Sequence, residues 1–133
     1  GELPDRLKQR QELFIRTGAL HAAGIFNQEG KLLFVREDIG RHNAVDKIVG
    51  AALLDEILPL NHCILQVSGR VSFEIVQKAY RAGIPAISAV SGASSLSISL
   101  ARTIGMTLAG FVRDGNYCLY SGGDCLLNPT PRG

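Results

Sequence analysis

The chain has 133 residues, of which 46% are hydrophobic and 20% charged, and its formal net charge is +2. These values fit one globular domain with its own core and argue against a disordered chain. The charge is too small to indicate nucleic acid. The longest apolar stretch, residues 48–60, is interrupted by Gly50, Asp55 and Pro59 and is too short to span a membrane. Because most of the basic residues are Arg, whose planar fork suits phosphate, an anionic small ligand is the favoured partner.

Three cysteines are present, Cys63, Cys118 and Cys125, and none of them forms a Cys-x-x-Cys pair. Cys63 lies in an apolar run, where a buried and inert thiol is expected. Cys118 and Cys125 flank a Gly-containing turn and could pair. The odd count and the lack of a visible signal peptide instead favour reduced thiols and a cytoplasmic protein.

The first half of the chain is expected to hold a helix, a hairpin and a second helix. A proline in the first turn and a glycine stop predict a helix over residues 4–18. Residues 20–27 and 31–37 are apolar runs joined by a Gln-Glu-Gly turn, which predicts a β-hairpin. Apolar residues at helical spacing predict a helix over residues 43–57, directly behind the most polar stretch of the chain.

Strand and helix patterns alternate in the second half. Residues 94–104 fit both, because apolar residues alternate with Ser, while Leu96, Leu100 and Ile104 have helical spacing. We expect a helix there, since Gly105 supplies a stop and the segments on both sides have strand patterns. The expected strands are residues 62–67, 86–90, 107–113 and 117–120, and the expected helices are residues 72–82 and 94–104. Ser72 can cap the first of these helices, which stops at Gly83.

This order of elements predicts an α/β sandwich with a mixed sheet. Parallel pairing is expected where a helix connects two strands, and antiparallel pairing at the hairpins. As domains, we expect a linker helix over residues 1–18, an α/β domain that binds a nucleotide or cofactor over residues 19–127, and a frayed tail over residues 128–133.

Two junctions between an expected strand and the following helix are unusually polar. Each contains a glycine and ends where a helix exposes free N–H groups, an arrangement that binds anions. The alternative is structural: the glycines make tight turns and the arginines pair with neighbouring acids. The candidate binding residues are Glu37, Asp38, Gly40, Arg41, His42, Asp46 and Lys47 at the first junction, and Ser68, Gly69, Arg70 and Glu74 at the second.

His42 could be a general acid or base, because histidine is the side chain whose charge ordinarily changes near neutral pH. Asp46 lies four residues later on the same face of the expected helix and could orient the imidazole. The alternatives are a capping or core role for His42 and an ordinary surface role for Asp46. His21, in an apolar strand, is expected to lie in the core or to line the site rather than to bind metal.

A zinc deaminase would need a His or Cys with a nearby Glu at the first junction and a Cys-x-x-Cys at the second. The second junction has no cysteine. We therefore expect no zinc site and no metal-dependent deamination, although a nucleotide could still bind there.

Three separated stretches together resemble a known family. Residues 37–47, 68–74 and 89–91, in that order, are similar to motifs of the formate dehydrogenase accessory proteins of the FdhD type, and the likeness runs from about Thr17 to Tyr120. These proteins act as sulfur carriers for the molybdenum cofactor. The resemblance implies a fold like that of cytidine deaminases, a three-layer sandwich with its site where two helix N-termini meet the sheet.

The resemblance also implies a ligand and partners. A protein of this family receives sulfur from a cysteine desulfurase and passes it to molybdenum or tungsten bis-molybdopterin guanine dinucleotide, before this cofactor enters the catalytic subunit of formate dehydrogenase. GDP is then a partial mimic of the cofactor. A homodimer is expected, because so small a domain has sheet edges and apolar helix faces to cover.

Residue by residue, the resemblance makes Arg41, Arg70 and Arg113 phosphate ligands, and Glu37, Asp38, His42, Asp46 and Glu74 orienting groups. Asn116 stands where family members can have a basic residue. The alternative for this last loop is a plain type I′ hairpin turn. Further candidates are Ser91 and the loop that would contact the guanine dinucleotide end, Phe111, Val112, Arg113, Asp114, Gly115 and Asn116.

The family's sulfur transfer uses a Cys-x-x-Cys loop that precedes this domain, and this chain has no such motif. A thiol is needed to accept sulfur, because the thiolate is the nucleophile. The motif is expected in a segment before Gly1, and a divergent member without sulfur transfer is the alternative. Two other hypotheses stay open, a nucleotide-modifying enzyme that uses His42 and Asp46, and a plain nucleotide sensor.

Overall fold

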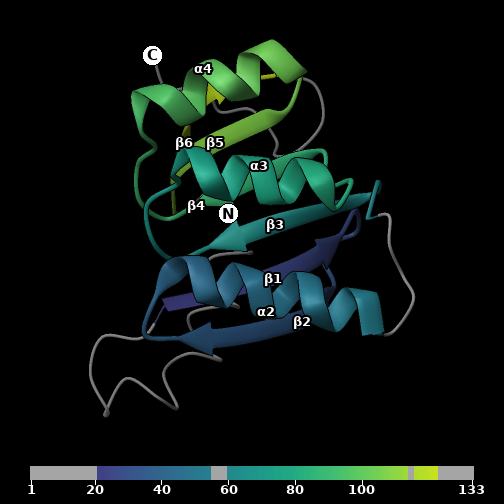
Figure 1. Ribbon diagram of the computed structural model, residues 1–133. Helices are drawn as coiled ribbons and strands as arrows, with labels where there is room; N and C mark the ends of the chain where they lie inside the picture. The colour runs from purple at the N-terminus through teal and green to yellow at the C-terminus, as the bar shows by residue number, and fades with distance from the viewer. Residues whose placement is uncertain (1–20, 55–59, 114–115, 123–133) are drawn as a thin grey trace.

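The computed structural model describes residues 21–54, 60–113 and 116–122 (Figure 1). They form a mixed six-stranded sheet and three helices. The strands are β1 (His21–Asn27), β2 (Leu32–Asp38), β3 (Cys63–Val67), β4 (Ala86–Ala89), β5 (Thr107–Arg113) and β6 (Asn116–Ser121), and the helices are α2 (Arg41–Leu54), α3 (Phe73–Arg81) and α4 (Ser95–Ile104).

The sheet has the strand order β2-β1-β3-β4-β5-β6. β1 is antiparallel to both β2 and β3, β3, β4 and β5 are mutually parallel, and β6 returns antiparallel to β5. β2, β3, β4 and β5 therefore all run in the same direction, and their C-terminal ends lie at one edge of the sheet. We call this edge the carboxyl edge.

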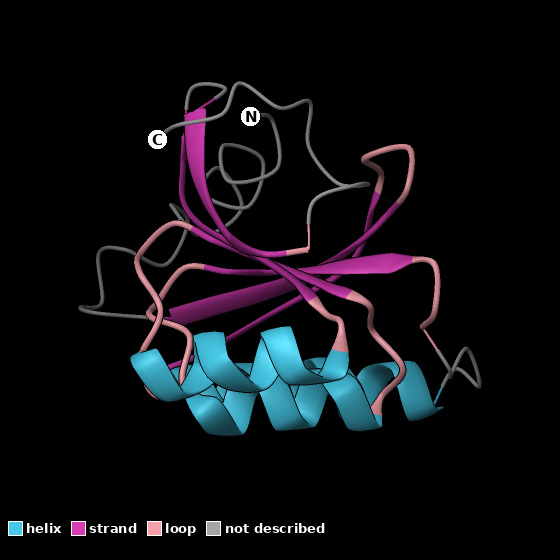
Figure 2. Cartoon of the chain, turned by 90° about the horizontal axis from the view of Figure 1, so that it is seen from above, coloured by secondary structure: helices cyan, strands magenta, loops and turns pink. Residues whose placement is uncertain are grey.

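All three helices lie on the same face of the sheet (Figure 2). The core forms between this face and the helices, because alternate strand residues such as Ile25, Leu65, Ile87 and Leu108 point toward them and are fully buried. α2 covers β1 and β2, and α3 lies between α2 and α4. No helix of the described part of the chain is both long enough and apolar enough to cross a membrane.

Side-chain caps and a glycine set the ends of α3 and α4. Ser72 caps α3, and its hydroxyl accepts a hydrogen bond from the Ile75 N–H. Ser94 caps α4 in the same way, and Gly105 ends α4 with a left-handed φ of 75°. Residues 94–104 thus form the expected helix rather than a strand.

The expected α/β class, mixed sheet and order of elements are confirmed for the described residues. α2 begins two residues before the expected start, because the Gly40 carbonyl accepts from the Ala44 N–H and draws Arg41 and His42 into the first turn. Helices of the described part cover only one face, so the three-layer arrangement and the likeness to cytidine deaminases stay predictions. The helix expected over 4–18 and the tail over 128–133 lie outside the described residues.

Candidate functional site

The carboxyl edge brings together the polar segments that are far apart in the sequence. The β2–α2 junction, the β3–α3 junction, the loop after β4 and the end of β5 all lie there. β1 and β6 begin at the same edge, and His21 is the register partner of Asp38. Ligands of open α/β sheets bind outside the carboxyl ends of the strands, so this edge is the candidate site.

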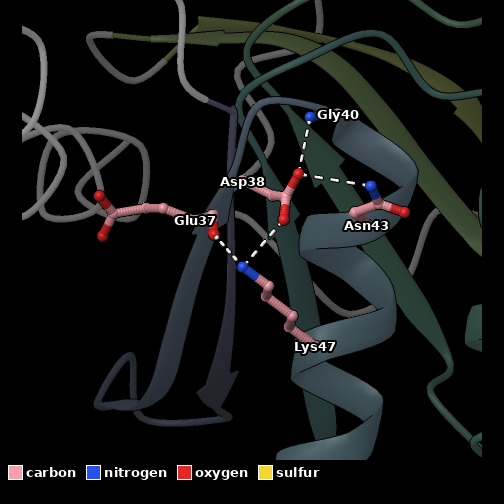
Figure 3. Close-up of polar contacts among 5 residues, drawn as sticks. All are labelled: Glu37, Asp38, Gly40, Asn43 and Lys47. Atoms are coloured by element: carbon pink, nitrogen blue, oxygen red, sulfur yellow. Dashed lines mark hydrogen bonds and ion pairs between the residues drawn. The ribbon is translucent and has the colours of Figure 1, made fainter. Parts of the chain in front are cut away.

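At the β2–α2 junction, Asp38 is the centre of a local network (Figure 3). Its Oδ1 accepts from the Gly40 N–H at 3.0 Å and from the Asn43 side-chain amide at 3.4 Å. Its Oδ2 lies 2.8 Å from Lys47 Nζ, which also donates to the Glu37 carbonyl at 3.0 Å. The network fixes the turn that leads into α2.

This network lowers the pKa of Asp38 and includes the Glu37 carbonyl but not the Glu37 carboxylate. Hydrogen bonding to Lys47, together with the Gly40 N–H, lowers the pKa of Asp38 to about 2. The Glu37 carboxylate extends away from Asp38 and α2, as Figure 3 shows. Asp38 and Lys47, which the sequence assigned to ligand binding, thus bind each other and position the start of α2.

The β3–α3 junction joins Ser68 to the neighbouring strand and leaves Arg70 exposed. The Ser68 hydroxyl accepts from the Ala22 N–H at 2.9 Å, and the Ser68 N–H donates to the Ala22 carbonyl. Arg70 makes no hydrogen bond or ion pair with a described residue. The alternative to ligand binding was that Arg70 forms an ion pair with Glu74 or another neighbouring acid. No such ion pair of Arg70 is present among the described residues.

His42 and Asp46, which the sequence suggested as a pair, have different partners. A hydrogen bond of 2.8 Å joins His42 Nε2 to the Ser72 hydroxyl, which also caps α3. Asp46 forms an ion pair of 2.7 Å with Lys78 on α3. The prediction that Asp46 orients the imidazole was wrong, because the neighbouring helix supplies a closer partner to each residue.

Backbone hydrogen bonds link the remaining loops of the carboxyl edge. The Val71 N–H donates to the Gly92 carbonyl, and the Ser94 N–H donates to the Val71 carbonyl, each at 3.0 Å. The Phe111 N–H donates to the Ser91 carbonyl at 3.1 Å. The loop after β3, the loop after β4 and the end of β5 therefore form one continuous surface.

Phe111 is the only described residue other than glycine with a positive φ, 52°. Such a backbone costs about 1–3 kcal/mol and persists only where its surroundings enforce it. The sheet supplies the cause: β5 has one extra residue between Gly110 and Arg113, opposite Cys118 and Asn116 of β6, which makes a β-bulge. The bulge turns the Phe111 side chain outward, with 50% of its surface exposed.

Val112, the neighbour of Phe111, lies in the core. Its side chain is fully buried against Ala109 and Tyr117, as alternation along the strand expected over residues 107–113 requires. Its place among the ligand contacts stays a prediction. The side chains of Arg41, Arg113 and Asn116, and the whole of Asp114 and Gly115, lie outside the described residues.

The sequence missed Ser72 and Gly92 as members of this site. Ser72 was expected only as a helix cap, and no pattern in the sequence indicates its bond to His42, thirty residues away. Gly92 matters because a Cβ there would lie 3.0 Å from Phe111 Cζ. In the sequence, the one signal for Gly92 is the Ser91-Gly92 pair that follows the buried strand β4.

The thiols of the described residues do not join the site. Cys63 begins β3, at the end of the sheet opposite the carboxyl edge, and burial raises its pKa, in keeping with the expected inert role. Cys118 is a free, partly buried thiol on β6. Among the described residues no three His, Cys, Asp or Glu side chains are grouped as a metal site would need.

Comparison with known proteins gives one consistent result. The model of the FdhD/NarQ family matches residues 1–126. Proteins named sulfur carrier protein FdhD from Streptomyces coelicolor and Mycobacterium tuberculosis are 55% and 52% identical over 92% of this chain. A relative with the same name from Saccharolobus solfataricus is 48% identical over 89% of this chain.

A solved structure agrees with these relatives. The crystal structure of a protein assigned as a formate dehydrogenase accessory protein, from Desulfotalea psychrophila, matches 95% of this chain with a TM-score of 0.86 and 31% identity. The match covers 54% of that chain. The alignments with the Streptomyces and Mycobacterium relatives cover 44% of each, so this chain spans less than half their length.

Proposed function

Because the chain belongs to the FdhD/NarQ family, we propose that it is the cofactor-binding part of a sulfur carrier that serves formate dehydrogenase. The family membership agrees with the motifs of residues 37–47, 68–74 and 89–91. In this proposal the whole protein takes sulfur from a cysteine desulfurase and delivers it to bis-molybdopterin guanine dinucleotide, of molybdenum or tungsten. This chain holds the guanine nucleotide portions of that cargo.

The observation that carries the proposal is the pairing of two helix N-termini with an exposed arginine at the carboxyl edge. α2 and α3 both begin there, and their first turns are joined by the bond between His42 and Ser72. Arg70 stands beside the start of α3 without a partner among the described residues. Free N–H groups, helix dipoles and a guanidinium suit the phosphates of a nucleotide.

The residues of the β2–α2 junction have a supporting role in this proposal. Asp38, Gly40 and Lys47 position the first turn of α2 through their own contacts. Arg41 is proposed as a further phosphate ligand from its place at the β2–α2 junction, and Arg113 from the family resemblance. The bound cofactor would itself supply the metal, and this chain would hold and orient the nucleotide ends of the cofactor.

Binding of GDP tests the proposal. Isothermal titration of the chain with GDP, ADP and inorganic phosphate should give micromolar to millimolar affinity for GDP and weaker binding of the other two. Equal affinity for all three would reduce the site to a general anion site. Failure of GDP to bind would contradict the proposal for this chain.

Partners and assembly are proposed from the same family. A cysteine desulfurase and the catalytic subunit of formate dehydrogenase are the expected partners of the whole protein, in the cytoplasm. We also propose a homodimer, which light scattering would check: a monomeric mass would rule it out. The alternative of an enzyme that uses His42 and Asp46 as an acid–base pair loses its basis, since these residues do not contact each other.

A further inference from the structure

Gln66 and Ser88 are polar side chains in the interior of the protein, on the sheet face that lies away from the helices (Figure 2). Their flanking residues on β3 and β4 all belong to the core between the sheet and the helices. Because side chains alternate along a strand, Gln66 and Ser88 point to the opposite face. Both residues are 0% exposed.

Each of these two side chains has a polar atom without a hydrogen-bond partner. The side-chain amide nitrogen of Gln66 donates to the Val67 carbonyl at 3.3 Å, so Oε1 is the unpaired end of this amide. Neither Gln66 Oε1 nor Ser88 Oγ makes a hydrogen bond in the described part of the chain. Buried polar atoms are almost always paired with protein or with ordered water, because an unpaired one lowers stability. The two atoms therefore need a partner that the described residues do not supply.

The two side chains lie next to each other and have small neighbours. Gln66 and Ser88 are register partners on the parallel strands β3 and β4. Gly24 lies opposite Gln66 on β1, and Ala109 lies opposite Ser88 on β5, so the same row of the sheet continues with small residues. No charged residue of the described part is buried. This position therefore suits a small neutral molecule that can both donate and accept hydrogen bonds.

We propose that Gln66 and Ser88 hold one ordered water molecule in the interior of the protein. The water donates a hydrogen bond to Gln66 Oε1, and its oxygen accepts one from the Ser88 hydroxyl. Polar groups that lie side by side without a direct hydrogen bond are spaced for such a bridge. The inference is independent of nucleotide binding and does not rest on the proposed function.

The direction of the stability change in Ser88→Ala distinguishes a bridged hydroxyl from an unpaired one. If the hydroxyl holds a water, its removal takes away one partner of that water, and the urea midpoint should fall by about 0.5 M. Removal of an unpaired buried hydroxyl would instead raise the midpoint. The matched control is Ser97→Ala, which also removes a buried hydroxyl, one that donates to the Ser94 carbonyl at 2.7 Å.

A double-mutant cycle with Gln66→Met tests whether the two side chains share one partner. Because one water serves both, Ser88→Ala should lower the midpoint less in the Gln66→Met background than in the original chain. Ser97→Ala should lower the midpoint equally in both backgrounds, since Ser97 lies on α4 and has its own partner.

NMR of the original chain detects the water directly. Nuclear Overhauser effects between a long-lived water and the amide protons of Gln66 and Ser88 should be present, and the amide of Ser97 should show none. The signal at residues 66 and 88 should disappear in the double variant of Gln66→Met and Ser88→Ala. Absence of the signal in the original chain, or a raised urea midpoint of Ser88→Ala, would overturn the inference. If Ser88→Ala does not fold, the NMR result of the original chain decides by itself.

Discussion

Single residues at the carboxyl edge divide into those already bound by the protein and those available to a ligand. Asp38 and Lys47 satisfy each other, and the Asp38 carboxylate also receives the N–H of Gly40. Arg70 makes no such contact with the described residues. Substitutions at these positions should therefore affect different properties, stability at Asp38 and affinity at Arg70.

Replacing Arg70 with Ala should harm binding and spare the fold. A charge-assisted contact to phosphate is worth about 1.5–3 kcal/mol, so GDP affinity should fall about tenfold or more. The urea midpoint should not change, because no contact within the described chain is lost. Arg81→Ala, at the far end of α3, is the matched control and should bind GDP normally. A lowered midpoint with unchanged affinity would mean that Arg70 is structural.

The low pKa of Asp38 predicts an acid-sensitive junction. Its folded value of about 2 lies below the unfolded value of about 3.9, so the ionised carboxylate stabilises the fold above pH 4. This stabilisation should disappear as the pH falls from about 4 to about 2. Urea midpoints of the original chain and of Asp38→Asn should therefore converge over that range.

Two further variants examine the cause of this pH dependence. Lys47→Met removes the largest source of the lowered pKa of Asp38, so the loss of stability on acidification should be smaller and should be complete at a higher pH. Glu29→Gln, an exposed acid in the β1–β2 turn, should leave the profile of the original chain unchanged. A constant difference between the original chain and Asp38→Asn from pH 6 to 2 would contradict the assignment.

At the scale of elements, α2 and α3 are joined at their first turns and again further along. The bond between His42 and Ser72 links the two starts, and the ion pair of Asp46 with Lys78 links their bodies. Two helix N-termini held in this way present their free N–H groups with a fixed spacing. The Ser72 hydroxyl serves both this link and the cap of α3.

A double-mutant cycle of His42→Ala and Ser72→Ala should measure this link. Ser72→Ala alone should destabilise the fold by about 1–2 kcal/mol, because it removes the cap and the contact with His42 together. The coupling energy between the two sites should be about 1 kcal/mol by urea unfolding. Ser94→Ala removes only a cap, from α4, and is the reference. A coupling near zero would show that the contact adds nothing.

The elements themselves follow from local pattern, whereas the contacts between them do not. Apolar runs joined by a turn indicated the hairpin of β1 and β2, and Ser72 and the glycine stops indicated the ends of α3 and α4, because these features depend on neighbours in sequence. The partner of His42 depends on how α2 and α3 pack, and the outward turn of Phe111 depends on a bulge against β6. Sequence reasoning could place these residues at one edge and could not tell which of them bind one another.

Over the whole molecule, the two ends of the sheet have different roles. The carboxyl edge carries the helix starts and the linked loops, while the β1–β2 turn and the ends of α3 and α4 lie at the opposite end. The loops after β3 and β4 and the strand β5 are hydrogen-bonded to one another, so a ligand that contacts one of them should restrain the others.

Hydrogen exchange should reveal this restraint. Saturating GDP should slow amide exchange in residues 39–42, 68–72 and 91–94 together, since binding stabilises the folded state of the edge as a unit. Residues 28–31, in the turn at the opposite end, should exchange at the same rate with and without GDP. Protection limited to one of the three segments would argue against a continuous surface.

Because the candidate site lies at one end of the sheet, a label or a surface tether can be attached at the opposite end. Gln28 lies exposed in the β1–β2 turn, at the end of the sheet remote from the helix starts. Once Cys125 is replaced by Ser, a cysteine at this position could carry a fluorophore or tether the chain to a sensor surface, since the thiols of Cys63 and Cys118 are partly buried. A chain immobilised there would present its carboxyl edge to the solution, with every loop of the candidate site facing the analyte.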